Sequence, residues 1–380
     1  MDYSIGLVFL SKIVLPVKQD GIFTYFPILD HESRFKKIKK YYGLGQKIDN
    51  NKYVNEILEI INSFSPDVIH LFGIENPFSN ILGNTSVPIF VHLQGIMTAC
   101  ENAFWPAGIN ELSIKIKPSK REWLLRNGFL YSYKCIEELS HREEALLKKV
   151  NNIIGRTEFD RKFSSLFASG SRYFHVDEVL RPVFYDNVGR WRFHNHSTIN
   201  IVSVISGTLY KGLDQILKTA KVLSGLCRAS FKWSVIGITS ESRVVKIIES
   251  SIGISSQSVC VNYCGTLSAE QICELGLSSD VFVHPTYIDN SPNSVCEAQL
   301  IGIPVIATYV GGVPSLFPEL DTNQLIAAND PISMAYSIVK VSSDENYAKK
   351  VSLKGVEFAE KRHDRDAIKQ SLIRAYLSVI

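Results

Sequence analysis

Short runs of β-branched and apolar residues alternate along the chain with segments whose apolar residues recur at helical spacing. In the first half, a helical run at residues 53–64 precedes strand-like runs, and a long helical region carries a charge cluster at 137–149. The expected strands are residues 66–72, 88–93, 152–155, 199–205, 232–237, 259–265, 280–284, 304–308 and 324–327. Such alternation is typical of βα units that build parallel sheets. It predicts an α/β protein with two doubly wound, Rossmann-like domains.

The same pattern divides the chain into three parts. Residues 1–185 form the predicted N-terminal domain, residues 186–363 the C-terminal domain, and residues 364–380 a helix that returns to the N-terminal domain. An irregular, polar and aromatic stretch at 181–197 is the predicted linker. Ligands of such sheets bind beyond the carboxyl ends of the strands, so we expect a cleft between two facing domains.

The start of the chain departs from this plan. Residues 4–10 can form a strand, but residues 11–16 contain no glycine-rich turn and residues 21–28 already read as another strand. One βα unit is therefore expected to be missing. Either residues 4–10 replace the usual central strand, or the functional protein begins upstream of Met1. We accordingly expect the C-terminal half to be complete and the N-terminal half to be compromised.

Composition narrows the class of protein. The 380 residues are 45% hydrophobic and 21% charged, which is the profile of a globular enzyme, and the net charge of +3 argues against nucleic acid as a partner. No apolar run reaches the roughly 18–20 residues that cross a bilayer. The seven cysteines match neither a disulfide framework nor a zinc site, which favours the cytoplasm. A basic, aromatic stretch at 34–42 has two interpretations. It is either a solvated face of a helix, or a segment that contacts the anionic inner face of the cytoplasmic membrane peripherally.

The segment from His284 to Ala298 carries the most chemical information. A buried strand ends at His284, a polar loop follows, and a helix is expected to begin near Ser291 and Pro292. Asp289 and Glu297 are separated by seven residues and flank that helix start. Two carboxylates beside an anion-binding helix terminus suit a ligand that carries both hydroxyls and phosphates, such as a nucleotide-sugar. The alternative is a helix-capping Asp289 and a surface Glu297.

This segment resembles the glutamate-seven-glutamate motif of the retaining family 4 glycosyltransferases, which have the GT-B fold. The string from Ile288 to Ala298, with the later Gly311 and Gly312, is especially similar to a bacterial polysaccharide-assembly subgroup. The resemblance implies that Glu297 holds the ribose hydroxyls and Asp289 those of the transferred hexose. Further donor-binding positions that it implies are Asn290, Ser291, Asn293, Ser294, Val295, Gly311 and Gly312.

Two cations are candidates for the donor diphosphate. Lys211 and Gly212 lie between the first strand and first helix of the second half, and they resemble the family's lysine-glycine element. The arginine that the family often places five or six residues earlier is absent. Arg156, at the end of the run 152–155 in a string similar to that of the subgroup, is a candidate replacement. Equally, Arg156 can simply pair with Asp160 on the adjoining helix.

On the acceptor side the candidates are Gln94, His92 and Glu75. Gln94 stands where many relatives have a histidine, and glutamine donates hydrogen bonds but cannot act as a general base. His92 is the nearest histidine, although a lone strand histidine is more often packed than catalytic. Glu75 follows a strand and can equally be a solvated loop residue.

The resemblance implies a retaining hexosyltransferase of capsule, lipopolysaccharide or other cell-surface polysaccharide synthesis, with a glycan or lipid-linked acceptor. Catalysis would be electrostatic, by Lys211, Asp289, Glu297 and backbone amides, with the nucleotide-sugar as co-substrate. Neither a metal nor another cofactor is expected. Two alternatives remain: a sugar-nucleotide epimerase of similar architecture, and a non-catalytic nucleotide-binding subunit of a polysaccharide-assembly complex.

Overall fold

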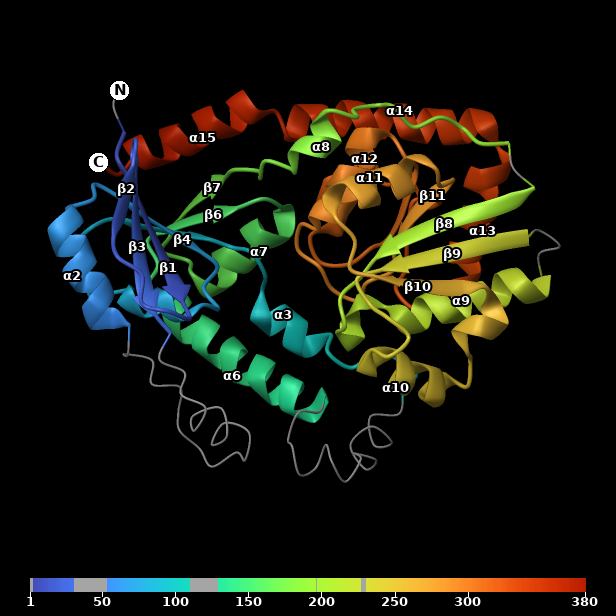
Figure 1. Cartoon of the computed structure of the whole chain (residues 1–380), viewed down its shortest axis with the longest axis horizontal. Helices are drawn as coiled ribbons and strands as arrows, with labels where there is room; N and C mark the ends of the chain where they lie inside the picture. Colours follow the sequence, from blue (N-terminus) through green and yellow to red (C-terminus); the bar gives the residue numbers. More distant parts are fainter. Residues whose placement is uncertain (1–2, 31–52, 110–128, 196, 227–229) are drawn as a thin grey trace.

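The computed structural model describes residues 3–30, 53–109, 129–195, 197–226 and 230–380. These residues form two lobes, each built around a parallel β-sheet (Figure 1). The basic stretch at 34–42 lies outside the described residues. Within the described part of the chain, no helix combines the length and the apolar character needed to cross a membrane.

The main sheet of the first lobe has four parallel strands in the order β4-β5-β6-β7. They are β4 (Ile69–Phe72), β5 (Ile89–His92), β6 (Asn152–Gly155) and β7 (Arg172–His175). The pattern missed β7 because none of its residues is fully buried. The helices of this lobe are α2 (Val54–Phe64), α3 (Met97–Asn102), α6 (Phe129–Leu147) and α7 (Glu158–Phe167).

The first strands form a separate sheet. Strands β1 (Ile5–Ser11) and β3 (Phe23–Leu29) are parallel, and β2 (Lys18–Asp20) pairs antiparallel with β3. Among the described strands, β1 does not join the sheet that contains β4. The alternative in which residues 4–10 take the central place of that sheet is therefore wrong. Strand β1 instead forms its backbone hydrogen bonds with β3, and Phe26 of β3 packs edge-on against Phe64 of α2.

The second lobe has a parallel sheet in the order β10-β9-β8-β11-β12-β13. Its strands overlap the predicted runs: β8 (Thr198–Val204), β9 (Ser230–Ile236), β10 (Val261–Gly265), β11 (Val281–His284), β12 (Val305–Thr308) and β13 (Leu325–Ile326). The helices around it are α9 (Leu213–Leu226), α10 (Arg243–Ile252), α11 (Ala269–Leu277), α12 (Asn293–Ile301), α13 (Pro331–Ser343) and α14 (Glu345–Arg362).

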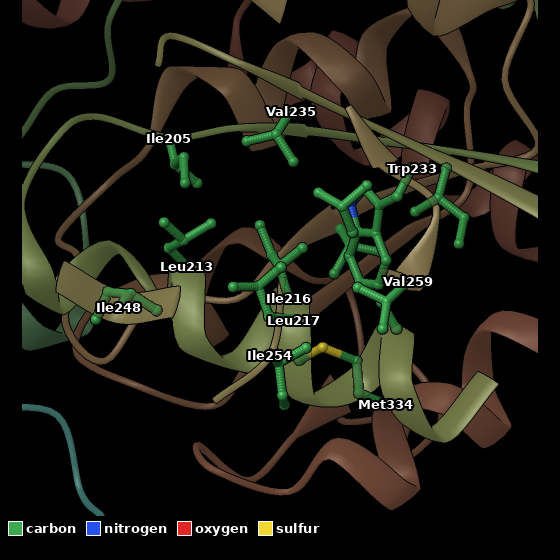
Figure 2. Packing of buried hydrophobic residues seen from close by; sticks show 14 of the residues in the cluster. Ile205, Leu213, Ile216, Leu217, Trp233, Val235, Ile248, Ile254, Val259 and Met334 are labelled. Carbon is green, nitrogen blue, oxygen red and sulfur yellow. The ribbon is translucent and has the colours of Figure 1, made fainter. Parts of the chain in front are cut away.

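One core of this lobe packs α9 and α10 against the sheet (Figure 2). Leu213, Ile216 and Leu217 of α9 are at most 1% exposed. Trp233 of β9 is fully buried, and its indole Nε1 donates a hydrogen bond to Ser203 Oγ at 3.0 Å. A buried polar group that is paired in this way avoids the desolvation penalty of an unpaired one. The core therefore fixes the strand ends from which the site loops leave.

The stretch between the lobes is more ordered than the irregular linker that the sequence predicts. Pro182 starts a short helix, α8 (Pro182–Tyr185), as proline does at a first helical position, and Trp191 is 4% exposed. At the end of the chain, α15 (Arg365–Leu377) lies beside the first lobe (Figure 1). Ala375 belongs to a buried cluster with Phe90 of β5. The domain boundaries themselves stay a prediction.

Candidate active site

The loop that follows β11 is fastened to the turn that follows β8. Tyr287 N–H donates to the carbonyl of Tyr210 at 2.8 Å, and Thr286 Oγ1 donates to the same oxygen at 3.0 Å. Both loops leave the carboxyl ends of neighbouring strands, which is where ligands bind in parallel sheets. Helix α12 begins at Asn293, slightly later than the sequence predicts, and Pro292 caps it without a side-chain hydrogen bond.

Asp289 is the centre of this arrangement. Its Oδ2 lies 2.6 Å from Lys211 Nζ and 3.0 Å from Nε2 of His284, the last residue of β11. Burial alone would raise the pKa of Asp289, but attraction by Lys211 and the hydrogen bond from His284 lower it below the usual range of an aspartate. The carboxylate is therefore charged at neutral pH. Two candidates 78 residues apart in sequence are brought into direct contact.

Two glycines allow these loops to approach so closely. Gly212 has a φ of +79°, and a Cβ at this position would lie 1.9 Å from the carbonyl oxygen of Pro285. Gly311 has a φ of +51°, and its Cβ would lie 2.2 Å from the carbonyl oxygen of Asp289. Any side chain would force these backbones apart. Both glycines are thus needed to hold Lys211 and Asp289 in their present geometry.

A cavity of about 170 Å³ lies where the two lobes meet at this pair. It is lined by Gln94, Gly95, Ile96, Met97, Ala99, Cys100 and Phe159 of the first lobe and by Tyr210, Lys211, Ile288, Asp289 and Asn290 of the second. Pockets for small molecules usually measure about 300–1,000 Å³. This cavity is therefore large enough for only part of a nucleotide-sugar in the conformation described.

Asn290 connects the lobes through its side chain. Its Oδ1 accepts a hydrogen bond from Thr157 Oγ1 at 2.9 Å, and its Nδ2 donates to Asp160 Oδ1 at 2.7 Å. Asn290 is 5% exposed. Its amide is therefore engaged with the first lobe, whereas the sequence predicts a donor contact. Of the neighbouring donor candidates, Ser291 and Val295 are buried, Ser294 is half-buried and Asn293 is exposed.

Glu297 does not line the cavity. It is 3% exposed, so the interpretation of Glu297 as a surface residue is wrong. Arg181, at the start of α8, holds both of its carboxylate oxygens in a two-pronged ion pair with distances of 2.7 Å. The Arg181 guanidinium also lies over the ring of Phe184. The sequence places Arg181 only at the start of the predicted linker, and it does not predict the contact with Glu297.

Arg156 has a third partner that neither sequence interpretation named. Its guanidinium lies 2.5 Å from Glu178 and donates to the carbonyl of Gln94 at 3.3 Å. Asp160 instead accepts a hydrogen bond from the Arg156 backbone N–H. Arg156 is 3% exposed and lines a second cavity of about 430 Å³ together with Arg362. It supports the Gln94 loop and does not line the cavity at Asp289.

The acceptor-side candidates separate in the structure. Gln94 lines the cavity, but His92 and Glu75 do not. His92 is 4% exposed, and its Nδ1 lies 3.2 Å from Nε2 of His70. Burial, with the nearby His70 and Arg156, lowers the pKa of His92 to about 3. Burial raises the pKa of Glu75. Among the described residues, no group of three or more potential ligands gathers that could hold a metal ion.

Comparison with known proteins identifies relatives of the second lobe and of the whole fold. Residues 192–357 match the family model of glycosyl transferases group 1. D-inositol 3-phosphate glycosyltransferase of Corynebacterium diphtheriae is 28% identical over 109 residues, which cover 29% of this chain and 25% of that protein. Amylovoran biosynthesis glycosyltransferase AmsK of Erwinia amylovora is 24% identical over 158 residues, which cover 40% of this chain and 37% of that protein.

These alignments therefore cover only 25% and 37% of the two relatives' lengths. Among solved structures, sucrose-phosphate synthase from Thermosynechococcus elongatus superposes with a TM-score of 0.65 at 14% identity, covering 96% of this chain and 85% of the other. A likeness at this identity concerns the fold alone. It confirms the predicted GT-B architecture of two Rossmann-like domains.

Proposed function

We propose that this chain, which has the GT-B fold and a second lobe matching the group 1 glycosyl transferases, transfers a hexose from a nucleotide-sugar to a glycan or lipid-linked acceptor with retention of configuration. The observation that carries the proposal is the Lys211–Asp289 pair in the cavity between the lobes. In cell-surface polysaccharide synthesis, the product would be an extended glycan.

A bound donor would exchange partners with this pair. The diphosphate is an anion and would take the ammonium of Lys211, while the hexose hydroxyls would donate to the Asp289 carboxylate that Lys211 releases. Because Lys211 and Asp289 are held by the two glycine turns before the donor arrives, little reorganisation is needed. Amides at the start of α12 and the Gly311 amide would take further diphosphate oxygens, whereas the Gly312 N–H already donates to the carbonyl of Asp289 at 3.0 Å.

The transfer step needs no protein base in this scheme. The acceptor hydroxyl oxygen attacks the anomeric carbon on the face from which the diphosphate leaves, the bond from that carbon to the phosphate oxygen breaks, and the same oxygen accepts the hydroxyl proton. His92 supports this view, since it does not line the cavity and has a pKa of about 3, which makes it a poor proton acceptor at neutral pH. We also propose that this transfer step needs no metal ion.

Glu297 would receive the ribose hydroxyls only after Arg181 shares or releases it. In the conformation described, Arg181 occupies both carboxylate oxygens. The ribose hydroxyls would then replace part of this ion pair, and Arg181 could turn to another acceptor on the donor. Donor binding would thereby be coupled to the segment that joins the lobes.

A transfer assay on the purified chain tests the proposal. Nucleotide-sugars are first screened by thermal shift, and each one that binds is incubated alone, with glycan or lipid-linked acceptors, and with acceptor plus a chelator. We expect an acceptor-dependent product whose anomeric configuration, measured by nuclear magnetic resonance, matches that of the donor and whose rate survives chelation. Donor conversion without an acceptor would favour an epimerase, and binding without any conversion would favour a non-catalytic subunit.

A further inference from the structure

The strongest feature outside the site is an exposed apolar loop in the first lobe. Residues 12–17 join β1 to β2 and contain Ile13, Val14, Leu15 and Val17, which are 65%, 81%, 41% and 62% exposed. Ser11 fixes the start of this loop, because its Oγ donates to the carbonyl of Ile13 at 2.7 Å. Four large apolar side chains held in water by a single loop indicate a binding surface.

The adjoining sheet extends this apolar surface. Ile5, Leu7 and Phe9 of β1 point to the same face because they alternate along the strand, and each is 37–39% exposed. The register places Phe23 of β3 opposite Ile5, and Phe23 is also 37% exposed. The opposite face of this sheet carries Phe26, which packs on α2. The core therefore does not require the outer apolar row.

Two lysines at the ends of the loop indicate which partner covers it. Lys12 and Lys18 are exposed, and the 4.0 Å pair between Lys18 and Asp20 is open to water and therefore weak. Lysine is depleted in protein interfaces, whereas at a bilayer its stem covers apolar surface and its ammonium reaches the headgroups. A symmetric contact between two copies would bring like charges to one interface.

We propose that residues 12–18 and the outer face of β1 and β3 dock on a lipid bilayer with anionic headgroups. Ile13, Val14, Leu15 and Val17 enter the boundary of the acyl chains, and Lys12 and Lys18 contact the phosphates. This surface is separate from the cavity at Asp289, and the inference does not depend on the transfer reaction. It would hold the first lobe at a membrane while leaving the donor site in the second lobe accessible.

Vesicle sedimentation of the full chain tests this inference. The vesicles contain either phosphatidylcholine alone or phosphatidylcholine mixed with phosphatidylglycerol. We expect binding to the anionic vesicles that weakens as salt is added, since salt screens the lysines. Replacing Lys12 or Lys18 by glutamine should weaken that binding about fivefold each. Ile13→Ser combined with Val14→Asp should abolish it.

A matched control separates this surface from general hydrophobicity. Ile332 on α13 of the second lobe is 67% exposed, so Ile332→Ser removes a similar side chain from another face and should leave vesicle binding unchanged. The midpoint of thermal unfolding, measured by circular dichroism, should be the same in all variants, which shows that they fold. The inference is overturned if anionic vesicles bind no better than neutral ones, or if Ile332→Ser weakens binding as much as the loop variant. It is also overturned if the chain forms dimers in solution that Val14→Asp separates.

Discussion

In each lobe a fully buried strand ends at a histidine, and the two histidines have different hydrogen-bond partners. His284 ends β11 and bonds a carboxylate, Asp289, which in turn holds Lys211. His92 ends β5, and its Nδ1 lies next to another histidine, His70, whose own Nδ1 lies 2.5 Å from the hydroxyl of Tyr376 on α15. The strand position is the same in both lobes, but the partners differ.

The consequence is a charged site in one lobe and a neutral one in the other. Lys211 compensates the burial of Asp289, so the second lobe keeps separated charges that a polar ligand can exchange. In the first lobe, no carboxylate contacts His92 among the described residues, and burial lowers the pKa of His70 to about 4. The strand end at His284 is thus arranged for electrostatics, and the strand end at His92 for packing.

Removing Lys211 should have the largest effect, since it leaves the Asp289 charge without its main partner and the diphosphate without its cation. We expect Lys211→Ala to lower kcat/KM by about 10²- to 10³-fold, measured by initial rates of transfer. Lys246→Ala is the matched control, because Lys246 pairs with Glu241 on the exposed surface of the same lobe. Near-normal turnover of Lys211→Ala would remove the basis for a charged donor site.

Next in size is the ion pair between Arg181 and Glu297. The resemblance to the family implies that Glu297 holds the ribose hydroxyls, and on that ground alone Glu297→Ala would lose activity with the fold intact. Because Glu297 is buried, we now expect Glu297→Ala to lower both transfer and the free energy of unfolding. Arg181→Lys should keep the charge but lose the two-pronged contact, and therefore raise KM for the donor more than it lowers kcat.

A double-mutant cycle on Arg181→Met and Glu297→Gln separates the two roles. If the pair only stabilises the fold, the coupling appears in denaturant unfolding but not in KM for the donor. Coupling in both measurements supports a role of Arg181 in positioning Glu297. Glu319→Ala, which removes an exposed carboxylate paired with Lys354, should change neither measurement.

A smaller effect is expected at Asp289 itself. Asp289→Asn keeps a hydrogen-bond acceptor but loses the charge, so it should weaken selection among hexoses, by about tenfold in relative kcat/KM, more than it weakens binding of the free nucleotide. Asp289→Glu should be tolerated, as the resemblance to the family implies. Calorimetry measures the affinity for the free nucleotide, and competition between two donor sugars measures the selection among hexoses. An equal loss in both would contradict the proposed division of roles.

The sequence predicts the second lobe well because its signals are local. The strand β11 is a continuous run of buried residues, and the polar loop that follows it must lie at the carboxyl end of a parallel sheet. Lys211 follows the neighbouring strand β8, so topology alone brings it near Asp289. For Lys211 and Asp289, the order of the strands is therefore enough to predict that the two side chains lie close together.

Other contacts depend on the path of the chain over long distances. Arg181 and Glu297 are 116 residues apart, and their pairing requires the short helix α8 to start beside α12. The lowered pKa of His92 depends on burial and on its neighbour His70, whose own partner Tyr376 lies 306 residues further along the chain. No local pattern encodes such contacts. The sequence could therefore identify His92 as a candidate without revealing that it is buried away from the cavity.

The last prediction concerns the pH dependence of stability, which tests the first lobe without an activity assay. The pKa values of His70 and His92 in the folded chain are about 4 and about 3, below the value of about 6.5 in an unfolded chain. Between pH 6.5 and pH 4, the unfolded chain thus binds protons that the folded chain does not. The free energy of unfolding should therefore fall as the pH falls through this window.

Urea unfolding at a series of pH values measures how the free energy of unfolding changes with pH. A single histidine whose pKa is lowered as far as that of His70 contributes a total change on the order of 3 kcal/mol across this window. Glu178 near His70 opposes the shift, Arg156 near His92 adds to it, and the buried His363 contributes in the same direction. Replacing both His70 and His92 by glutamine should flatten the slope without removing it. His141→Gln, on an exposed face of α6, is the control and should leave it unchanged. An unchanged slope in the double variant would mean that His70 and His92 are not the neutral, buried pair that sets the first lobe apart from the charged second lobe.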